Sequence, residues 1–150
     1  MTDDLPFGRY AGAGRTILDP PRQRDGTARH GYGLDVFAQC GYTCVYCGLD
    51  MASDFRAWLQ LSVDHVVPHQ MAGQGFDRRH VESVSNLVTC CRACNDLGNR
   101  YAPPPGPAPT TDDEFLALRD SVFRDRRAMI LKRRAEEEAV YRKLIAGSPR

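Results

Sequence analysis

The chain has 150 residues, of which 42% are hydrophobic and 26% are charged. This composition excludes a collagen-like or wholly disordered protein and predicts a single domain of ordinary size. No run approaches the roughly 18 apolar residues of a membrane span, and the first ten residues lack an export signal pattern, so we expect no membrane contact and a cytoplasmic location. Net charge is +1, yet residues 119–134 hold seven Arg or Lys against two Asp. Such a stripe attracts phosphate, although a solvated helix face explains it equally well.

The composition changes along the chain and predicts four segments. Residues 1–30 are rich in Gly, Pro, Arg and Asp, which predicts an extended N-terminal arm. Residues 31–101 hold the only Trp, three of the four His and all six Cys, and we interpret them as the chemical core. The Pro-rich residues 102–110 predict a semi-rigid linker. Residues 111–150 predict a basic C-terminal helical tail, with the helix over 111–146 beginning at the capping box Thr111-x-x-Glu114.

Within the core, hydrophobic periodicity predicts a small α+β fold. Alternation of polar and apolar residues over 58–63 predicts a half-buried strand that runs into Asp64 and His65. Pro68 and the Gly-rich residues 73–75 then predict a loop. A second strand is expected over 86–89 and a helix from Cys91 to about residue 100. The order of knuckle, strand, loop, strand and helix is the layout of a treble-clef zinc finger that carries a ββα unit.

Six cysteines are many for a chain expected in a reducing compartment, where clustered thiols more often bind metal than form disulfides. Four of them form two Cys-x-x-Cys pairs, and two such pairs can hold one tetrahedral zinc ion. The predicted ligands are Cys44, Cys47, Cys91 and Cys94. Coincidence or a redox pair is the alternative. We interpret Cys40 and Cys90 as ordinary small apolar residues.

Four short stretches occur in an order that closely resembles the HNH endonucleases, the ββα-metal or His-Me finger nucleases, in the subgroup with a four-cysteine structural zinc. The stretches are CVYCG at 44–48, DHVVP at 64–68, NLVT at 86–89 and CRACN at 91–95. Each is a weak signal alone, but the ordered combination is specific. The resemblance covers residues 41–101.

The resemblance implies a role for each motif residue. His65 corresponds to the general base that activates water, and a neutral imidazole suits that role near pH 7. Asp64 and Asn95 correspond to ligands of a catalytic Mg²⁺ or Mn²⁺. Two protein oxygens leave such an ion open positions for phosphate, as phosphodiester hydrolysis requires. Asn86 corresponds to a scaffold residue that ties the loop to the hairpin. Four Cys leave zinc no open position, so one structural zinc per chain is expected.

The sequence also departs from the family pattern. Many relatives place Lys and Gly a few residues after the final motif Asn, and here Arg100 is the candidate for the phosphate contact. Arg78 and Arg79, in the loop between the motif's strands, are further candidates for backbone phosphates. His69 is either a second base, a DNA contact or a solvated loop residue. Asp96, beside the metal position, is either a surface cap or an outer group of the metal site.

The C-terminal helix admits three interpretations. Its apolar residues fall near one line of a helical wheel: Phe115, Leu118, Val122, Met129 and Val140. Arg126 and Arg133 interrupt this line, so the middle of the helix is basic nearly all round, which is unexpected for a helix that packs on a core. Following DNA phosphates is one interpretation, with Arg126, Arg127, Arg133 and Arg134 as the contacts. A solvated helix, or a homodimer formed through Phe115, Leu118 and Val122, are the others.

Together these features predict a DNA endonuclease, a phosphodiester hydrolase that leaves 5′-phosphate and 3′-hydroxyl ends. The alternative is a treble-clef zinc module that binds nucleic acid without cutting it. The presence of Asp64, His65 and Asn95 together favours the nuclease, because a module that only binds has no need of them.

Overall fold

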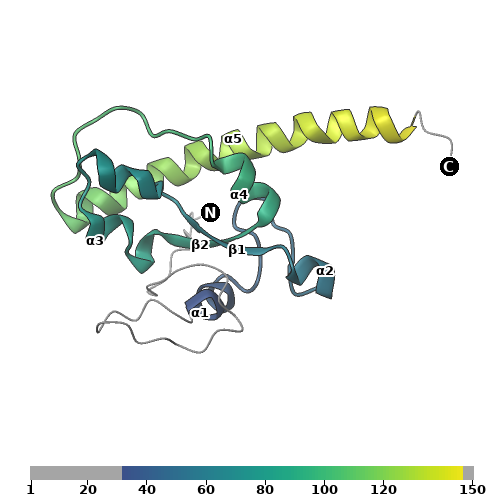
Figure 1. The fold of residues 1–150 in the computed structure, drawn as a ribbon, viewed down its shortest axis with the longest axis horizontal. Coiled ribbons are helices and arrows are strands. Elements are labelled where there is room, and N and C mark those ends of the chain that lie inside the picture. Colours follow the sequence, from purple (N-terminus) through teal and green to yellow (C-terminus); the bar gives the residue numbers. More distant parts are fainter. Residues whose placement is uncertain (1–31, 147–150) are drawn as a thin grey trace, which may run out of the picture.

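The computed structural model describes residues 32–146; the predicted N-terminal arm lies outside the described residues (Figure 1). Its centre is a two-stranded antiparallel sheet. Strand β1 (Leu61–His65) pairs with β2 (Leu87–Cys91), with Leu61 opposite Cys91 and His65 opposite Leu87. Helix α4 (Arg92–Gly98) follows β2 without a loop. This is the ββα unit that the sequence predicts, and the α+β fold class is confirmed.

The first strand begins later than the alternation of residues 58–63 predicts. A short helix, α2 (Phe55–Trp58), occupies the start of that stretch because the Asp54 side chain caps it, accepting bonds from two backbone amides. Leu59 follows this helix and is 53% exposed, whereas Leu61 is buried. The local capping interaction therefore overrides the period-two pattern at this end of the strand.

The connection between the two strands is structured rather than a plain loop. It contains η1 (His69–Gln74), α3 (Arg78–Val81) and η2 (Val84–Asn86). Its apolar residues form a small second cluster with the first turn of the C-terminal helix. The buried members of that cluster are Val67, Phe76, Val81 and Phe115.

Helix α5 (Asp112–Ala146) begins with the predicted capping box, in which Thr111 Oγ1 accepts a bond from the amide of Glu114 and Glu114 Oε2 accepts one from the amide of Thr111. Its first half packs on the ββα unit, while its C-terminal end projects beyond it (Figure 1). The buried residues lie on one face of the helix: Phe115, Arg119, Val122, Phe123, Arg126 and Ile130.

This packing bears on two sequence-based interpretations of α5. The helix is not set off from the core, because Val122, Phe123 and Ile130 belong to the same apolar cluster as the cysteines. Two of the three residues of the homodimer interpretation, Phe115 and Val122, are each 1% exposed and contact the chain's own core, and the third, Leu118, packs partly against it. The two buried arginines of the helix face inward with them rather than toward solvent.

A further helix, α1 (Tyr32–Gln39), covers the side of the sheet opposite α4 and α5 (Figure 1). Val36 and Phe37 are buried there, and Thr89 Oγ1 donates to the Val36 carbonyl at 2.9 Å. The small sheet is therefore covered on both faces. Among residues 32–146, no helix combines the length and apolarity needed to cross a membrane.

Candidate active site and metal centre

The four predicted zinc ligands come together in one cluster. Their sulfur atoms lie within 4.8 Å of one another, and Cys47 Sγ is 3.9 Å from Cys91 Sγ. A tetrahedral ion with Zn–S bonds of about 2.3 Å sets its sulfurs about 3.8 Å apart. All four thiols are free of disulfides. The cluster is therefore a metal-binding site whose donors and spacing are compatible with zinc.

Two local structures deliver these thiols. The first pair lies on a tight turn in which the Gly48 amide bonds the Cys44 carbonyl at 2.8 Å, and Gly48 adopts φ 76°, which glycine accepts without strain. The second pair spans the junction of β2 and α4, because Cys91 ends the strand and caps the helix. Cys90 points elsewhere and its thiol donates to the Ser62 carbonyl at 3.6 Å.

A pocket of about 250 Å³ lies between the end of β1, the connection that follows it, and α4. Asp64, His65 and Asn95 all line it, so three of the four predicted motif residues meet in one place. His69 and Arg126 line it as well. We call this space the nuclease pocket.

The fourth motif residue, Asn86, lies fully buried beneath the connection. Its Nδ2 donates to the carbonyls of Val67 and Val81 at 3.0 and 2.8 Å, and its Oδ1 accepts from the Val67 amide at 2.9 Å. These bonds tie the segment that follows His65 to the hairpin. They are contacts of a scaffold residue and do not reach into the pocket.

His65 is half-buried at the end of β1, and its ring meets the His69 ring edge to face at 5.4 Å. Burial, together with the nearby charges of His69 and Arg126, lowers the pKa of His65 to about 4, against a smaller opposing effect of Glu82. The imidazole is therefore neutral near pH 7, which is the form that accepts a proton.

Asp64 is buried, and its carboxylate is held by two residues that the sequence analysis did not place at this site. Oδ2 accepts a 2.7 Å bond from the Tyr46 hydroxyl and lies 3.0 Å from Arg126 Nη1, while Oδ1 accepts from Arg126 Nη2 at 3.1 Å. Burial raises the pKa of Asp64, and Arg126 and Tyr46 oppose that rise by stabilising the ionised form.

The predicted role of Arg126 as a DNA contact is therefore wrong. The sequence predicts that it contacts DNA phosphates, but its side chain is 3% exposed and is paired with Asp64. The helical wheel of α5 already indicated this burial. Arg126 lies on the same face as Phe115 and Val122, so it faces the core, where its charge requires a polar or acidic partner. For Tyr46, between two zinc ligands, no sequence signal pointed to Asp64.

The other predicted DNA-contact arginines of α5 also touch the core. Arg127 Nε donates to the Tyr46 carbonyl at 3.2 Å, Arg133 Nη1 to the Leu97 carbonyl at 3.4 Å and Arg134 Nη1 to Cys94 Sγ at 3.6 Å. These contacts fasten α5 to α4 and to the turn that carries the first Cys pair. Arg127 is exposed, and Arg133 and Arg134 are half-buried, so each remains in reach of solvent.

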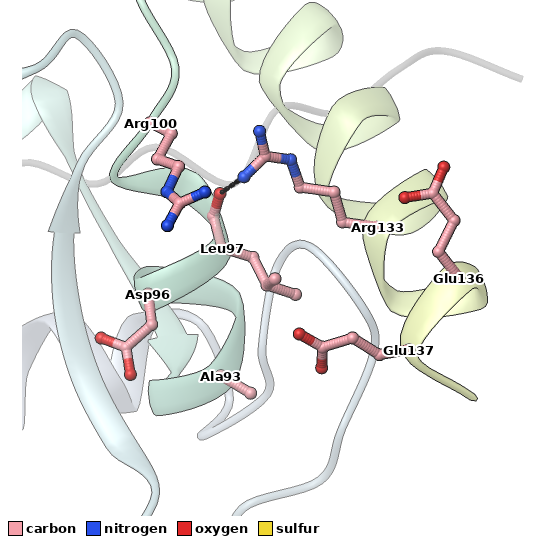
Figure 2. Close-up of a pocket in the computed structure, with 7 residues that line it drawn as sticks. All are labelled: Ala93, Asp96, Leu97, Arg100, Arg133, Glu136 and Glu137. Atoms are coloured by element: carbon pink, nitrogen blue, oxygen red, sulfur yellow. Dashed lines mark hydrogen bonds between the residues drawn. The ribbon is translucent and has the colours of Figure 1, made fainter. Parts of the chain in front are cut away.

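Arg100 and Arg133 line a second, open pocket of about 620 Å³ between α4 and α5. Figure 2 shows their guanidinium groups at one end, with the carboxylates of Asp96 and Glu137 toward the other. Asp96 forms a surface ion pair with Arg92, one turn earlier on α4. It is thus a surface residue of this second pocket and does not line the nuclease pocket.

The loop residues form local pairs. Arg78 bonds Glu82 and Arg79 bonds Asp77, and both arginines remain exposed. His80 stacks on the Phe115 ring at 5.0 Å and reaches Asp112 at 2.8 Å, so it joins α3 to the start of α5.

Asp64 and Asn95 fit a divalent ion by their chemistry. A carboxylate oxygen can accept two bonds, so Asp64 Oδ1 retains capacity beside Arg126. Asn95 Nδ2 donates to Ser62 Oγ at 2.7 Å, which holds its amide while the oxygen is the atom suited to a cation. Both residues line the same pocket.

Comparison with known proteins agrees with this geometry. Residues 44–100 match the family model described as HNH endonuclease. This segment, which holds both Cys pairs and all four motif residues, is an HNH endonuclease domain. Membership indicates a nuclease and hence a nucleic acid as the class of substrate. Neither the curated proteins nor the solved structures contain a match.

The metal cluster yields a test with a neighbouring control. We predict that Cys91→Ser reduces the zinc content of the purified chain well below the roughly one ion per chain expected of a four-thiolate site, because a hydroxyl is a poor zinc ligand. Cys90→Ser should retain the zinc, since that thiol contacts a carbonyl instead. Elemental analysis measures both, and loss of zinc in Cys90→Ser alone would contradict the cluster.

Proposed function

We propose that this chain is a divalent-metal-dependent endonuclease that hydrolyses DNA phosphodiester bonds in the nuclease pocket. The observation that carries the proposal is the convergence of His65, Asp64 and Asn95 in one pocket beside the four-cysteine cluster. A general base and two oxygen donors are the minimum for water activation and phosphate binding. All of them lie inside the segment that matches the HNH family.

In the proposed reaction, a water oxygen forms a bond to phosphorus and the bond from phosphorus to the 3′ oxygen breaks. His65 accepts the proton of the attacking water, and its half-buried, neutral ring suits this task. Asp64 and Asn95 would hold Mg²⁺ or Mn²⁺, which when bound neutralises charge on the phosphate and the leaving oxygen. Asn86 holds the chain after His65 and so fixes the position of the base.

The cysteine cluster has a structural role in this proposal. Four thiolates complete the tetrahedral shell of zinc and leave no position for water or phosphate. Its sulfurs lie within the main apolar cluster. Zinc binding would therefore contribute folding free energy to a domain with a small core.

DNA binding is assigned to arginines that remain accessible. Arg100 and Arg133 face one end of the second pocket, and among residues 32–146 neither forms an ion pair. A backbone phosphate between them would meet two guanidinium groups. Arg127 and Arg134 are secondary candidates, and Arg78 and Arg79 would have to share their guanidinium groups with Glu82 and Asp77.

Two alternatives stay open to experiment. A zinc module that binds nucleic acid without cutting would show metal-independent binding and no cleavage. A homodimer through α5 would now have to use its projecting end, where the apolar residues Val140, Tyr141, Leu144 and Ile145 are exposed.

The base assignment is tested by a matched pair of histidine variants. We predict that His65→Ala lowers the rate of plasmid cleavage with Mg²⁺ or Mn²⁺ by about 10²–10⁴-fold, as loss of a general base does, while DNA binding persists. His69→Ala, at the exposed ring beside it, should retain most activity. Wild-type cleavage should cease with EDTA. Full activity in His65→Ala would refute the assignment, and no cleavage by the wild-type chain on any duplex would favour the binding module.

The salt dependence of binding tests the arginine assignment. Replacing Arg100 and Arg133 together with Gln should flatten the plot of log affinity against log salt by about 0.9 for each phosphate that the variant no longer neutralises. Binding to all sequences should weaken alike. Arg142→Gln, at an exposed intrahelical pair with Glu138, is the control and should leave the slope unchanged. An unchanged slope in the double variant would contradict the proposed phosphate contacts.

A further inference from the structure

The guanidinium of Arg126 joins α5 to the nuclease pocket at Asp64 and at the backbone of His65. Nη1 donates to the carbonyl of His65 at 2.5 Å and to that of Val66 at 3.1 Å. The same group pairs with both oxygens of Asp64. One side chain from a distant helix thus contacts the proposed metal ligand and the backbone of the proposed base.

The end of α4 leaves room for the Arg126 guanidinium because residue 98 is a glycine. A Cβ atom at Gly98 would lie 2.8 Å from Arg126 Nη2 and 2.9 Å from Nε, so any larger residue at the end of α4 would displace the guanidinium. The Tyr46 ring lies beneath it, with its centroid 5.9 Å from Arg126 Cζ. Arg126 Nε is buried and has no hydrogen-bond partner among the described residues. The site therefore accommodates the charge at the cost of one unsatisfied donor.

We propose that Arg126 is a positioning residue of the nuclease site whose positive charge sets the affinity of Asp64 for the divalent ion. This inference rests on the proposed function. A cation that binds Asp64 must share a carboxylate that already carries a guanidinium, and two like charges on one acid repel each other strongly at low dielectric. Arg126 also holds the carboxylate in one orientation, and this effect by itself would favour binding of the ion.

The two effects can be weighed from the contacts. Alignment does not depend on Arg126 alone, because the Tyr46 hydroxyl holds Oδ2 at 2.7 Å and the β ladder pairs Asp64 with Val88. The repulsion does depend on Arg126, since among residues 32–146 it is the cation paired with Asp64. The charge of Arg126 therefore affects the affinity for the divalent ion more than its alignment of the Asp64 carboxylate does. The ion site is weak in the free protein and is completed when a substrate phosphate adds negative charge and further oxygens.

Helix α5 also supplies a matched control. Arg119 lies two turns earlier on the same buried face, donates from Nη1 to the Ser85 carbonyl at 2.7 Å and pairs with Asp120. It does not line the nuclease pocket. Arg119→Gln removes a buried arginine anchor of α5 without changing the charge on Asp64.

The experiment is a Mn²⁺ titration of the full zinc-loaded chain without DNA, followed by electron paramagnetic resonance. We expect Arg126→Gln to bind Mn²⁺ about tenfold more tightly or better than wild type, because a charge is removed beside the carboxylate. Arg119→Gln should stay within about twofold of wild type. Adding Asp64→Asn to Arg126→Gln should abolish the gain. Equal or weaker Mn²⁺ binding by a folded, zinc-loaded Arg126→Gln would overturn the proposal.

A second measurement on the unmutated chain covers the case in which Arg126→Gln does not fold. In protein labelled with ¹⁵N-arginine, Mg²⁺ titration should shift the side-chain resonance of Arg126 and leave that of Arg119 in place. No shift at Arg126 while Mg²⁺ binds would overturn the proposal. DNA cleavage is scored separately: tighter Mn²⁺ binding by the variant without cleavage by the wild type would refute the nuclease function and leave the charge effect standing.

Discussion

The buried ion pair between Asp64 and Arg126 is the contact on which the rest of this domain depends. It joins β1 to a helix 62 positions further along the chain. Breaking such a pair by removing one partner typically costs about 3–5 kcal/mol, because the other charge is left buried and uncompensated. Arg126 also satisfies the carbonyls of His65 and Val66. Helix α5 therefore cannot separate from the β1–β2 hairpin without leaving these buried polar groups unpaired, and the two form one unit.

The cysteine cluster provides a second contact point for helix α5. A zinc ion with four thiolates carries two net negative charges, and Arg134 reaches Cys94 Sγ from α5 at 3.6 Å. The helix thus places one arginine on a carboxylate of the nuclease pocket and another on the metal centre, about two turns apart. Phe123 and Ile130 of the same helix belong to the main apolar cluster. Arg127 and Arg133 reach carbonyl oxygens of the core in the same way, so much of the basic character of this helix is explained by polar groups beneath it.

The sequence predicted the ββα unit and the zinc ligands because both rest on local rules: strand alternation, capping and Cys-x-x-Cys spacing. It also predicted that Asp64, His65 and Asn95 belong together, through the resemblance. The role of Arg126 was wrong because a helical wheel shows phase but not what lies opposite a helix. A buried arginine and a solvated one look alike until the tertiary partner, Asp64, is known. The start of β1 was missed for the converse reason, since capping by Asp54 overrides alternation.

The most direct test of this account is a double-mutant cycle between Asp64→Asn and Arg126→Gln, measured as the free energy of unfolding of the zinc-loaded chain in denaturant. The account predicts that each single change is strongly destabilising and that the double variant loses less than their sum, with a coupling of about 2 kcal/mol or more. Additive effects, within about 0.5 kcal/mol, would show that the two side chains act independently and would contradict the account.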